Sequence, residues 1–283
     1  MATISINTPQ QYITLISGGY PSGTSEEHLI ANITADLDFG QIADLSSVFN
    51  AGYSYNNPNQ YTELNGNGHT LKNIIIYNVD DYFGFAVFFS INNVKFENCR
   101  IQYDARYSST FVYCFSDIYK FVWGASCQII TTDPTSSLVY CSGKMLESCV
   151  CGLINIADSD WQLIGANVVE RCFTAANITT TGALRIFNTG NLFDCFSRNV
   201  ISGVTAYRFV NGTNLCFNYN ADTFTSTPTT CIGIWGSDVN GIFESWYDST
   251  NVPDTTGLTC YAMSTADLKN SSVLLQHGWA IGV

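Results

Sequence analysis

Large apolar residues recur through the middle of the chain at a nearly constant interval of 23 residues. Two sets of positions keep this interval in phase, and some steps are stretched to 27 residues. The first set is Phe96, Trp123, Leu146, Val169, Leu192, Leu215 and Ile242, and the second is Val87, Cys114, Cys141, Ile164, Phe187 and Val210. Such a period is typical of a solenoid, in which each coil buries its inward side chains against the next coil.

The composition favours strands over helices. Hydrophobic residues make up 46% of the chain and aromatic residues 14%, whereas charged residues make up only 12%. Aromatic and β-branched residues joined by polar turns suit short strands. The consensus of leucine-rich repeats is absent, and the blades of WD40 propellers are nearly twice as long. We therefore predict an all-β, right-handed parallel β-helix with about 23 residues per coil.

A short residue stands three positions after each residue of the first set, and four of these are cysteines: Cys99, Cys149, Cys172 and Cys195. Because a free cysteine packs like a small apolar side chain, we predict a structural ladder inside the coils. Cys149 and Cys151 would share one face of a strand, but no second pair accompanies them. With three histidines and no Cys-x-x-Cys, we expect no metal site. Fingerprints of phosphate- or dinucleotide-binding loops are also absent, so we expect no cofactor.

We predict a single domain, with residues 1–30 as an N-terminal cap, 31–250 as coils and 251–283 as a C-terminal cap. A solenoid must cover its open ends, because exposed strand edges invite aggregation. Thr8 and Pro9 read as the N-cap and first residue of a short helix that ends at Gly18 and Gly19. Residues 264–269 read as a second capped turn.

The charge balance argues against two classes of partner. The net charge is -12, and the 11 basic residues are scattered. An acidic surface repels phosphate backbones and anionic lipids, so we expect neither nucleic acid nor membrane as a partner. The N-terminal residues lack the charged and apolar regions of a secretion signal, and no apolar stretch has the length of a spanning helix. We therefore expect a cytoplasmic origin with reduced cysteines.

Two segments resemble the two ends of a known type of protein. The first contains Ala35–Phe39, Phe49-Asn50 and Leu64–Ile74, and the second contains Trp246–Asp248, Met263–Lys269 and Gly278-Trp279. They are similar to the opening and closing segments of bacterial β-helix proteins with GLUG-type repeats. The glycine-rich signature itself is reduced to Phe83-Gly84-Phe85. This resemblance implies a right-handed parallel β-helix of adhesin or appendage character, without catalytic residues.

By analogy of fold, a β-helix without an export signal suggests a bacteriophage virion protein. We expect a structural head decoration, head fibre, or tail or baseplate appendage, located in the virion and docked on other virion proteins. A homotrimer is the favoured oligomer, because outer apolar strips can bury against each other. One alternative is a receptor-binding protein that binds or depolymerises polysaccharide. A second alternative is a bacterial surface adhesin.

Two groups of residues are candidates for chemistry or binding. Carboxylates about 5–10 Å apart can cut a glycosidic bond, and Asp80 with Asp81, or Asp158 with Asp160, are the candidate pairs. Both pairs lie where turns are expected, and aspartate is a common turn residue, so we predict that the protein is not an enzyme. The candidate glycan or partner contacts are the tyrosines of an Asn-rich segment: Tyr53, Tyr55 and Tyr61.

Overall fold

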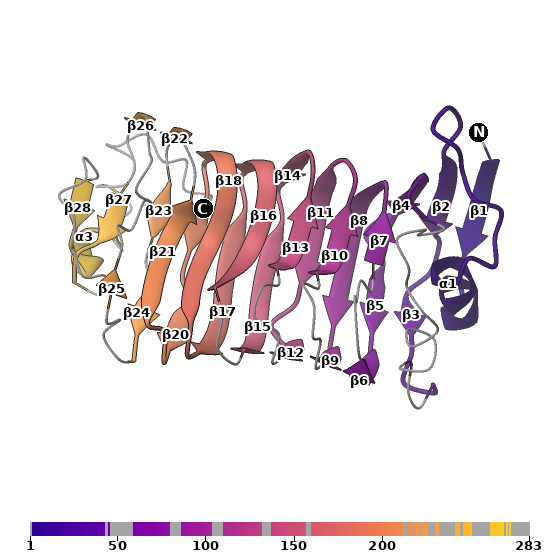
Figure 1. Cartoon of the computed structure of the whole chain (residues 1–283), viewed down its shortest axis with the longest axis horizontal. Coiled ribbons are helices and arrows are strands. Elements are labelled where there is room, and N and C mark those ends of the chain that lie inside the picture. Colours follow the sequence, from indigo (N-terminus) through magenta and orange to yellow (C-terminus); the bar gives the residue numbers. More distant parts are fainter. Residues whose placement is uncertain are drawn as a thin grey trace.

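A computed structural model of the chain shows a parallel β-solenoid in which the strands of successive coils lie side by side along a rod (Figure 1). The structure describes residues 2–42, 45, 59–79, 86–103, 110–131, 137–156, 160–211, 214–216, 218–220, 222–225, 230–231, 241–243, 246–250, 261–268, 270 and 272. The solenoid has about seven turns of roughly 25 residues. The predicted β-helix is therefore confirmed.

The described strands and helices follow one another along the rod from its N-terminal end. The first coils contain β1 (Ala2–Ile6), α1 (Pro9–Ile16), β2 (Leu29–Ile33), β3 (Leu37–Asp38), β4 (Thr62–Asn65), β5 (Thr70–Lys72) and β6 (Ile75–Val79). The middle coils contain β7 (Ala86–Phe88), β8 (Ser90–Glu97), β9 (Arg100–Tyr103), β10 (Thr110–Cys114), β11 (Ile118–Trp123), β12 (Gln128–Thr131), β13 (Ser137–Cys141), β14 (Lys144–Leu146) and β15 (Cys149–Ile156).

The later coils hold the longest strands and then much shorter ones. They contain β16 (Asp160–Glu170), β17 (Phe173–Thr180), β18 (Ala183–Phe193), β19 (Phe196–Ser197), β20 (Val200–Ser202), β21 (Ala206–Asn211), β22 (Asn214–Cys216), β23 (Tyr219–Asn220) and β24 (Thr223–Phe224). The last described elements are β25 (Thr230–Cys231), β26 (Gly241–Phe243), β27 (Trp246–Asp248), β28 (Tyr261–Met263) and α3 (Thr265–Leu268).

The helix α1 lies at the N-terminal end of the rod, as the sequence predicts (Figure 1). Its N-cap is Thr8, whose hydroxyl accepts a hydrogen bond from the Gln11 backbone N–H, while the Gln11 side-chain oxygen accepts one from the Thr8 backbone N–H. This capping box satisfies backbone donors that an open helix end would leave without partners. Tyr12, Leu15 and Ile16 are buried in the core. At the other end, Ser264 accepts a hydrogen bond from the Asp267 backbone, next to α3.

The first predicted ladder is correct at its two ends and wrong in its middle. Phe96 pairs with Trp123, and Val169 pairs with Leu192, as predicted; the pairing continues to Leu215 and Ile242. Trp123, however, pairs with Val150 rather than with Leu146. Leu146 pairs instead with Tyr119 and Glu170, and the buried neighbour of Val169 is Met145. The predicted ladder therefore joins two separate stacks. The stack of Trp123 continues after 27 residues to Val150 and then to Thr174, whereas the stack of Val169 runs back through Met145 to Ile118.

The second ladder shows smaller shifts. Cys114 pairs with Cys141, and Ile164 pairs with Phe187 and onward with Val210, as predicted. Val87 pairs with Tyr113, so it lies one residue out of line. Ile164 pairs with Val139 rather than with Cys141. Val139 and Cys141 are two residues apart and therefore lie on the same face of the strand, so Cys141 and Ile164 are both buried although they do not pair.

The cysteine ladder holds for two of its four residues. Cys172 and Cys195 are buried on adjacent coils, and the Cys172 backbone N–H donates to Cys195 Sγ over 3.5 Å. Cys99 is also buried, but it lies at a different position of the coil, directly before the row of Arg100, Gln128 and Leu153. Cys149 is only half-buried and is wrongly placed in the ladder. Ser148 takes the inner position instead, because the buried residue that corresponds to Val169 is Met145 rather than Leu146, and Ser148 is the third residue after it.

One corner of the solenoid is made by residues in the left-handed backbone conformation. Asn93, Lys120, Glu147, Arg171 and Asp194 have φ values between 49° and 53° and follow one another coil by coil. A single residue in this region turns the chain sharply while the strands on either side stay in register. Only one of the five is asparagine, a residue that tolerates this conformation well, and none is glycine.

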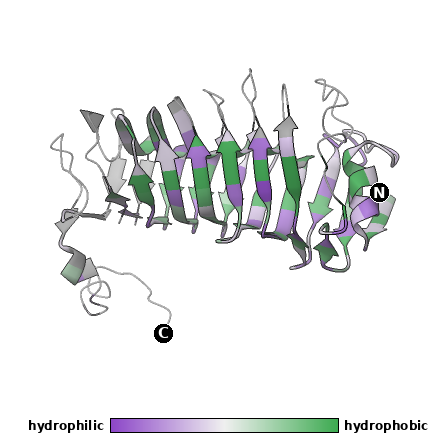
Figure 2. Ribbon diagram, turned by 90° about the horizontal axis from the view of Figure 1, so that it is seen from below, coloured by the Kyte–Doolittle hydropathy of each residue, from purple (hydrophilic) through white to green (hydrophobic). Residues whose placement is uncertain are grey.

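The interior is apolar along most of the rod, and hydrophobic segments of neighbouring strands lie side by side (Figure 2). Its largest fully buried side chains include Trp123, Trp161 and Tyr207. A fully buried polar cluster interrupts the core in the later coils. It consists of Thr174, Ser197, Asn199, Asn218, Asn220 and Asp222.

Candidate functional site

Most of the predicted chemical residues fall outside the described part of the chain. Asp80, Asp81 and Asp158, together with Tyr53 and Tyr55, lie outside the described residues. Asp160 begins strand β16, where it pairs with Ala183. The two carboxylate pairs therefore stay predictions. Among the described residues, no group of three or more His, Cys, Asp or Glu side chains could hold a metal ion.

Tyr61 is the one predicted binding tyrosine that the structure describes, and it lies against His28. The two rings are stacked, with centroids 6.2 Å apart, and Phe89 lies 4.0 Å from the His28 ring on the next coil. His28 Nδ1 is 2.9 Å from a Glu63 carboxylate oxygen. The spacing of residues along the sequence does not predict these contacts of His28, because its partners lie on neighbouring coils.

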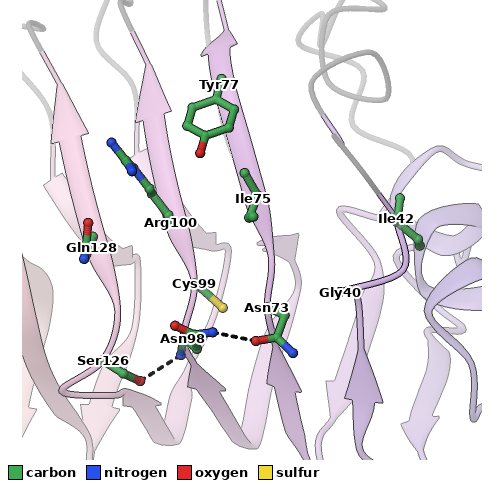
Figure 3. Close-up of a pocket in the computed structure, with 10 residues that line it drawn as sticks. All are labelled: Gly40, Ile42, Asn73, Ile75, Tyr77, Asn98, Cys99, Arg100, Ser126 and Gln128. Atoms are coloured by element: carbon green, nitrogen blue, oxygen red, sulfur yellow. Dashed lines mark hydrogen bonds between the residues drawn. The ribbon is translucent and has the colours of Figure 1, made fainter.

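A polar groove lies on one side of the first coils, where β6, β9 and β12 run in parallel (Figure 3). Its volume is about 330 Å³, and it is lined by Gly40, Ile42, Asn73, Ile75, Tyr77, Asn98, Cys99, Arg100, Ser126 and Gln128. It forms where the chain after β3 turns back on itself, with Ile42 N–H donating to the Phe39 carbonyl. The groove therefore belongs to a place where the regular coil is interrupted.

Side-chain amides form a hydrogen-bonded row along this groove. Asn73 donates to an Asp38 carboxylate oxygen over 2.6 Å. Asn98 donates to Asn73 Oδ1 over 2.6 Å (Figure 3). The Asn98 backbone N–H then donates to Ser126 Oγ over 2.8 Å. The hydrogen bonds from Asn73 and from the Gly40 N–H hold the pKa of Asp38 below its ordinary value. These amides are thus fixed in position before any ligand arrives.

Arg100 brings a positive charge to the groove. Its guanidinium lies 5.6 Å from the centre of the Tyr77 ring, within the range of a cation–π contact. Figure 3 shows both side chains projecting from neighbouring strands beside Gln128. A cation, fixed amides and an aromatic ring together suit a ligand that carries hydroxyl and carboxylate groups.

A second feature is a row of aromatic residues along one strand position of the later coils. The rings of Phe173 and Phe196 are stacked, 5.1 Å apart and inclined by only 8°. The same register continues to Tyr219, Trp246 and Tyr261. Phe173 and Phe196 are half-buried and alternate with the buried Thr174 and Ser197, so they lie on the outer face. We call Phe173, Phe196, Tyr219, Trp246 and Tyr261 the aromatic ladder.

Charged side chains occupy the corner next to the aromatic ladder. Glu147 accepts hydrogen bonds from the Tyr119 hydroxyl over 3.0 Å and from Arg171 over 3.1 Å. The bond from Tyr119, followed by that from Arg171, holds the pKa of Glu147 below its ordinary value. The pKa of Asp194 is raised, chiefly by partial burial and then by the charge of Glu170. The corner thus flanks the aromatic ladder with both signs of charge.

The aromatic ladder was missed at the level of sequence, although its signal was present. Phe173, Phe196 and Tyr219 keep the same 23-residue interval as the core ladders, and Trp246 follows after 27 residues. An interpretation that assigns the 23-residue interval to interior residues alone does not find the aromatic ladder. A period repeats every position of the coil, so outer residues can keep it as well.

Comparison of the chain with models of protein families, with curated proteins and with solved structures finds no significant match. The resemblance to proteins with GLUG-type repeats therefore stays a prediction. Within the described residues, neither helix has the length and apolar character needed to cross a bilayer.

Proposed function

We propose that this protein is a structural, non-enzymatic component of a bacteriophage virion, a rod that docks on other virion proteins through its outer surface. The aromatic ladder carries this proposal. Its residues are in register from coil to coil, and Phe173 and Phe196 lie on the outer face. Such a row suits a stable protein interface, because aromatic side chains dominate the energetics of buried contacts. The assignment to a virion rests on the analogy of fold.

Electron microscopy tests the virion assignment directly. An antibody raised against the purified chain would be used to label phage particles released from cells that carry the encoding gene. We expect gold label at one defined place on the particle, such as the head surface or the tail. Label confined to the bacterial surface, or protein found only in the soluble fraction after particles are sedimented, would overturn the assignment.

The ladder also predicts how copies of the chain associate. We propose a homotrimer in which the ladders of neighbouring copies pack against each other. Sedimentation analysis of the double variant Phe173→Ser/Phe196→Ser should show monomers, whereas the wild-type chain sediments as a trimer. Val200→Ser is the matched control, because Val200 is 44% exposed but lies on a different strand position. A monomeric wild-type chain, or a control that dissociates equally, contradicts this arrangement.

Polysaccharide binding is the second candidate function, and the groove beside Arg100 favours it. The fixed amides of Asn73 and Asn98 offer hydrogen bonds to sugar hydroxyls, and Arg100 offers a partner for the carboxylate of an acidic sugar. Calorimetric titration with acidic and neutral oligosaccharides distinguishes these contributions. We expect Arg100→Ala to abolish binding of acidic oligosaccharides at low salt. If no acidic oligosaccharide binds the wild-type chain, the groove is not such a site.

A further inference from the structure

Two cysteines lie in contact on the outer face of the solenoid. Cys149 and Cys151 are two residues apart on β15, and their sulfur atoms are 3.4 Å apart. Both side chains are half-buried, whereas the other six cysteines whose side chains the structure describes are buried. These two thiols are therefore the accessible ones in the described part of the chain. Neither lines the groove, and Cys149 lies on the coil before Phe173, at the strand position where the aromatic ladder begins.

The neighbouring coils leave room beside Cys151. Cys151 pairs with Ala175 of the following coil, and Gly124 lies at the corresponding position of the preceding coil, directly after the pair Trp123 and Val150. Both neighbours are small, so no bulky side chain stands on either side of the Cys151 sulfur along the rod. Cys149, in contrast, lies between Val122 and Phe173. Of the two sulfur atoms, that of Cys151 is the easier one for a small reagent to approach.

The two thiols also differ in acidity. The hydrogen bond from Cys149, helped by the backbone N–H of Ala175, lowers the pKa of the Cys151 thiol to about 7. The same contact, together with partial burial, raises the pKa of Cys149. Near neutral pH a large fraction of Cys151 is therefore thiolate, and the thiolate is the nucleophilic form of cysteine.

We propose that Cys149 and Cys151 form a reactive dithiol site that exchanges with small-molecule disulfides, in which Cys151 attacks and Cys149 resolves. The Cys151 thiolate attacks one sulfur of the reagent, the reagent's S–S bond breaks, and one thiolate leaves. Cys149 then loses its proton to solvent and attacks the Cys151 sulfur, which breaks the mixed disulfide and releases the second thiolate. The net reaction oxidises two protein thiols to one disulfide and reduces one reagent disulfide to two thiols. This site goes beyond the proposed structural role and does not depend on it.

The backbone allows this disulfide but strains it. Residues two apart on a strand have Cα atoms about 6.6 Å apart, at the upper end of the range of about 4.4–6.8 Å that disulfides span. Gly152 follows directly and turns the strand with a φ of +90°, so the chain bends next to the pair. A strained and exposed disulfide is easily reduced. The site is therefore reversible, and added thiol should restore both cysteines.

The test uses the folded full-length chain and the aromatic disulfide 5,5′-dithiobis(2-nitrobenzoate). Trypsin cuts after Lys144 and Arg171, which isolates Cys149 and Cys151 as the only cysteines of one peptide. We expect this peptide to lose two hydrogens and to carry no adduct. The adjacent peptide, residues 172–185, contains only the buried Cys172 and is an internal control that should keep its free thiol.

Single variants separate the two roles. In Cys149→Ser the first step still occurs, so the adduct should stay on Cys151. In Cys151→Ser we expect modification of Cys149 to be at least about tenfold slower near neutral pH, because its sulfur lies between Val122 and Phe173 and is harder to approach. Cys149→Ala repeats the test should the serine variant fail to fold by circular dichroism. A wild-type peptide that keeps its adduct, or that reacts only after denaturation, would overturn the proposal.

Discussion

The hydroxyl group of Tyr207 donates a hydrogen bond to the carboxylate of Asp222, and both side chains are fully buried inside the solenoid. The other Asp222 oxygen accepts from the backbone N–H of Asn199 over 2.7 Å and from its side-chain amide over 3.0 Å. Asn220 donates to the Tyr207 hydroxyl over 2.9 Å. No described basic side chain forms an ion pair with this carboxylate.

Replacing Asp222 with asparagine should change how stability depends on pH. Burial raises the pKa of Asp222 to about 6, above its ordinary value of 3.8. The folded state therefore binds this proton more tightly than the unfolded state does. The protonation of Asp222 therefore stabilises the folded state. This contribution is fully present below pH 3.8 and is lost as the pH rises through about 6. Between about pH 3.5 and 8, the free energy of unfolding of Asp222→Asn should gain about 3 kcal/mol relative to the wild-type chain.

Denaturant unfolding across that pH range measures the difference in the free energy of unfolding between wild type and Asp222→Asn. The test is the change of this difference with pH, so a constant loss from imperfect packing of the new amide does not affect it. Tyr207→Phe provides a second check. It removes a hydrogen bond that favours the charged carboxylate, and should therefore move the transition of the wild-type profile to higher pH. A difference between wild type and Asp222→Asn that does not vary with pH would show that folding does not raise the pKa of Asp222.

The 27-residue interval between Phe96 and Trp123 shows which features of the fold the sequence predicts and which it does not. Repetition alone was enough to predict the solenoid, because stacked coils place like residues above one another. The helical cap was predicted from the capping residues Thr8 and Pro9. Repetition did not locate the register across each insertion. Leu146 and Val150 are both apolar and flank the corner at Glu147, so a ladder drawn through either residue looks equally regular. Only the strand pairing distinguishes them.

The candidate surfaces could be predicted to different degrees. The aromatic ladder keeps the period of the coils, so it can be found from spacing once outer positions are considered. The groove could not be found in this way. Arg100 meets Tyr77 because β6 pairs with β9 in a particular register, and the groove opens because the chain turns after β3. Neither fact follows from the spacing of residue types.

Truncation of Met145 tests the corrected register. Met145 is fully buried between Ile118 and Val169, so Met145→Ala should lower the free energy of unfolding by about 2–5 kcal/mol. Leu146 is only half-buried, and Leu146→Ala should cost about 1 kcal/mol or less. Denaturant titration of both variants gives the comparison. A larger loss for Leu146→Ala would restore the ladder that runs through Leu146.

Gly152 should tolerate no side chain. Its φ is +90°, and a Cβ atom there would lie 2.3 Å from the Cys127 carbonyl oxygen, which belongs to the backbone of the preceding coil. We expect Gly152→Ala to cost more than about 2 kcal/mol, because both the conformation and the contact are unfavourable. Gly190→Ala is the control, since its nearest contact would be 3.3 Å and its φ is not positive. If thermal unfolding shows equal losses, the close approach of the coils at Gly152 is wrong.

Asp194 and Asp36 should respond in opposite directions to the same substitution by asparagine. Asp194 has a φ of 50°, which asparagine tolerates better, and partial burial beside Glu170 raises its pKa. The charged form is thus disfavoured in the folded state, and Asp194→Asn should stabilise the chain at neutral pH by up to about 1 kcal/mol.

Asp36 accepts hydrogen bonds from the Thr70 backbone and from His69, which lower its pKa, so Asp36→Asn should destabilise the chain at neutral pH. Its loss should disappear as the pH falls below the ordinary pKa of aspartate. The electrostatic part of the gain at Asp194 should disappear at higher pH, as the pH falls through the raised pKa of Asp194 to the ordinary value. Two changes of the same sign at neutral pH would show that the carboxylates of Asp36 and Asp194 do not experience the distinct environments seen in the structure.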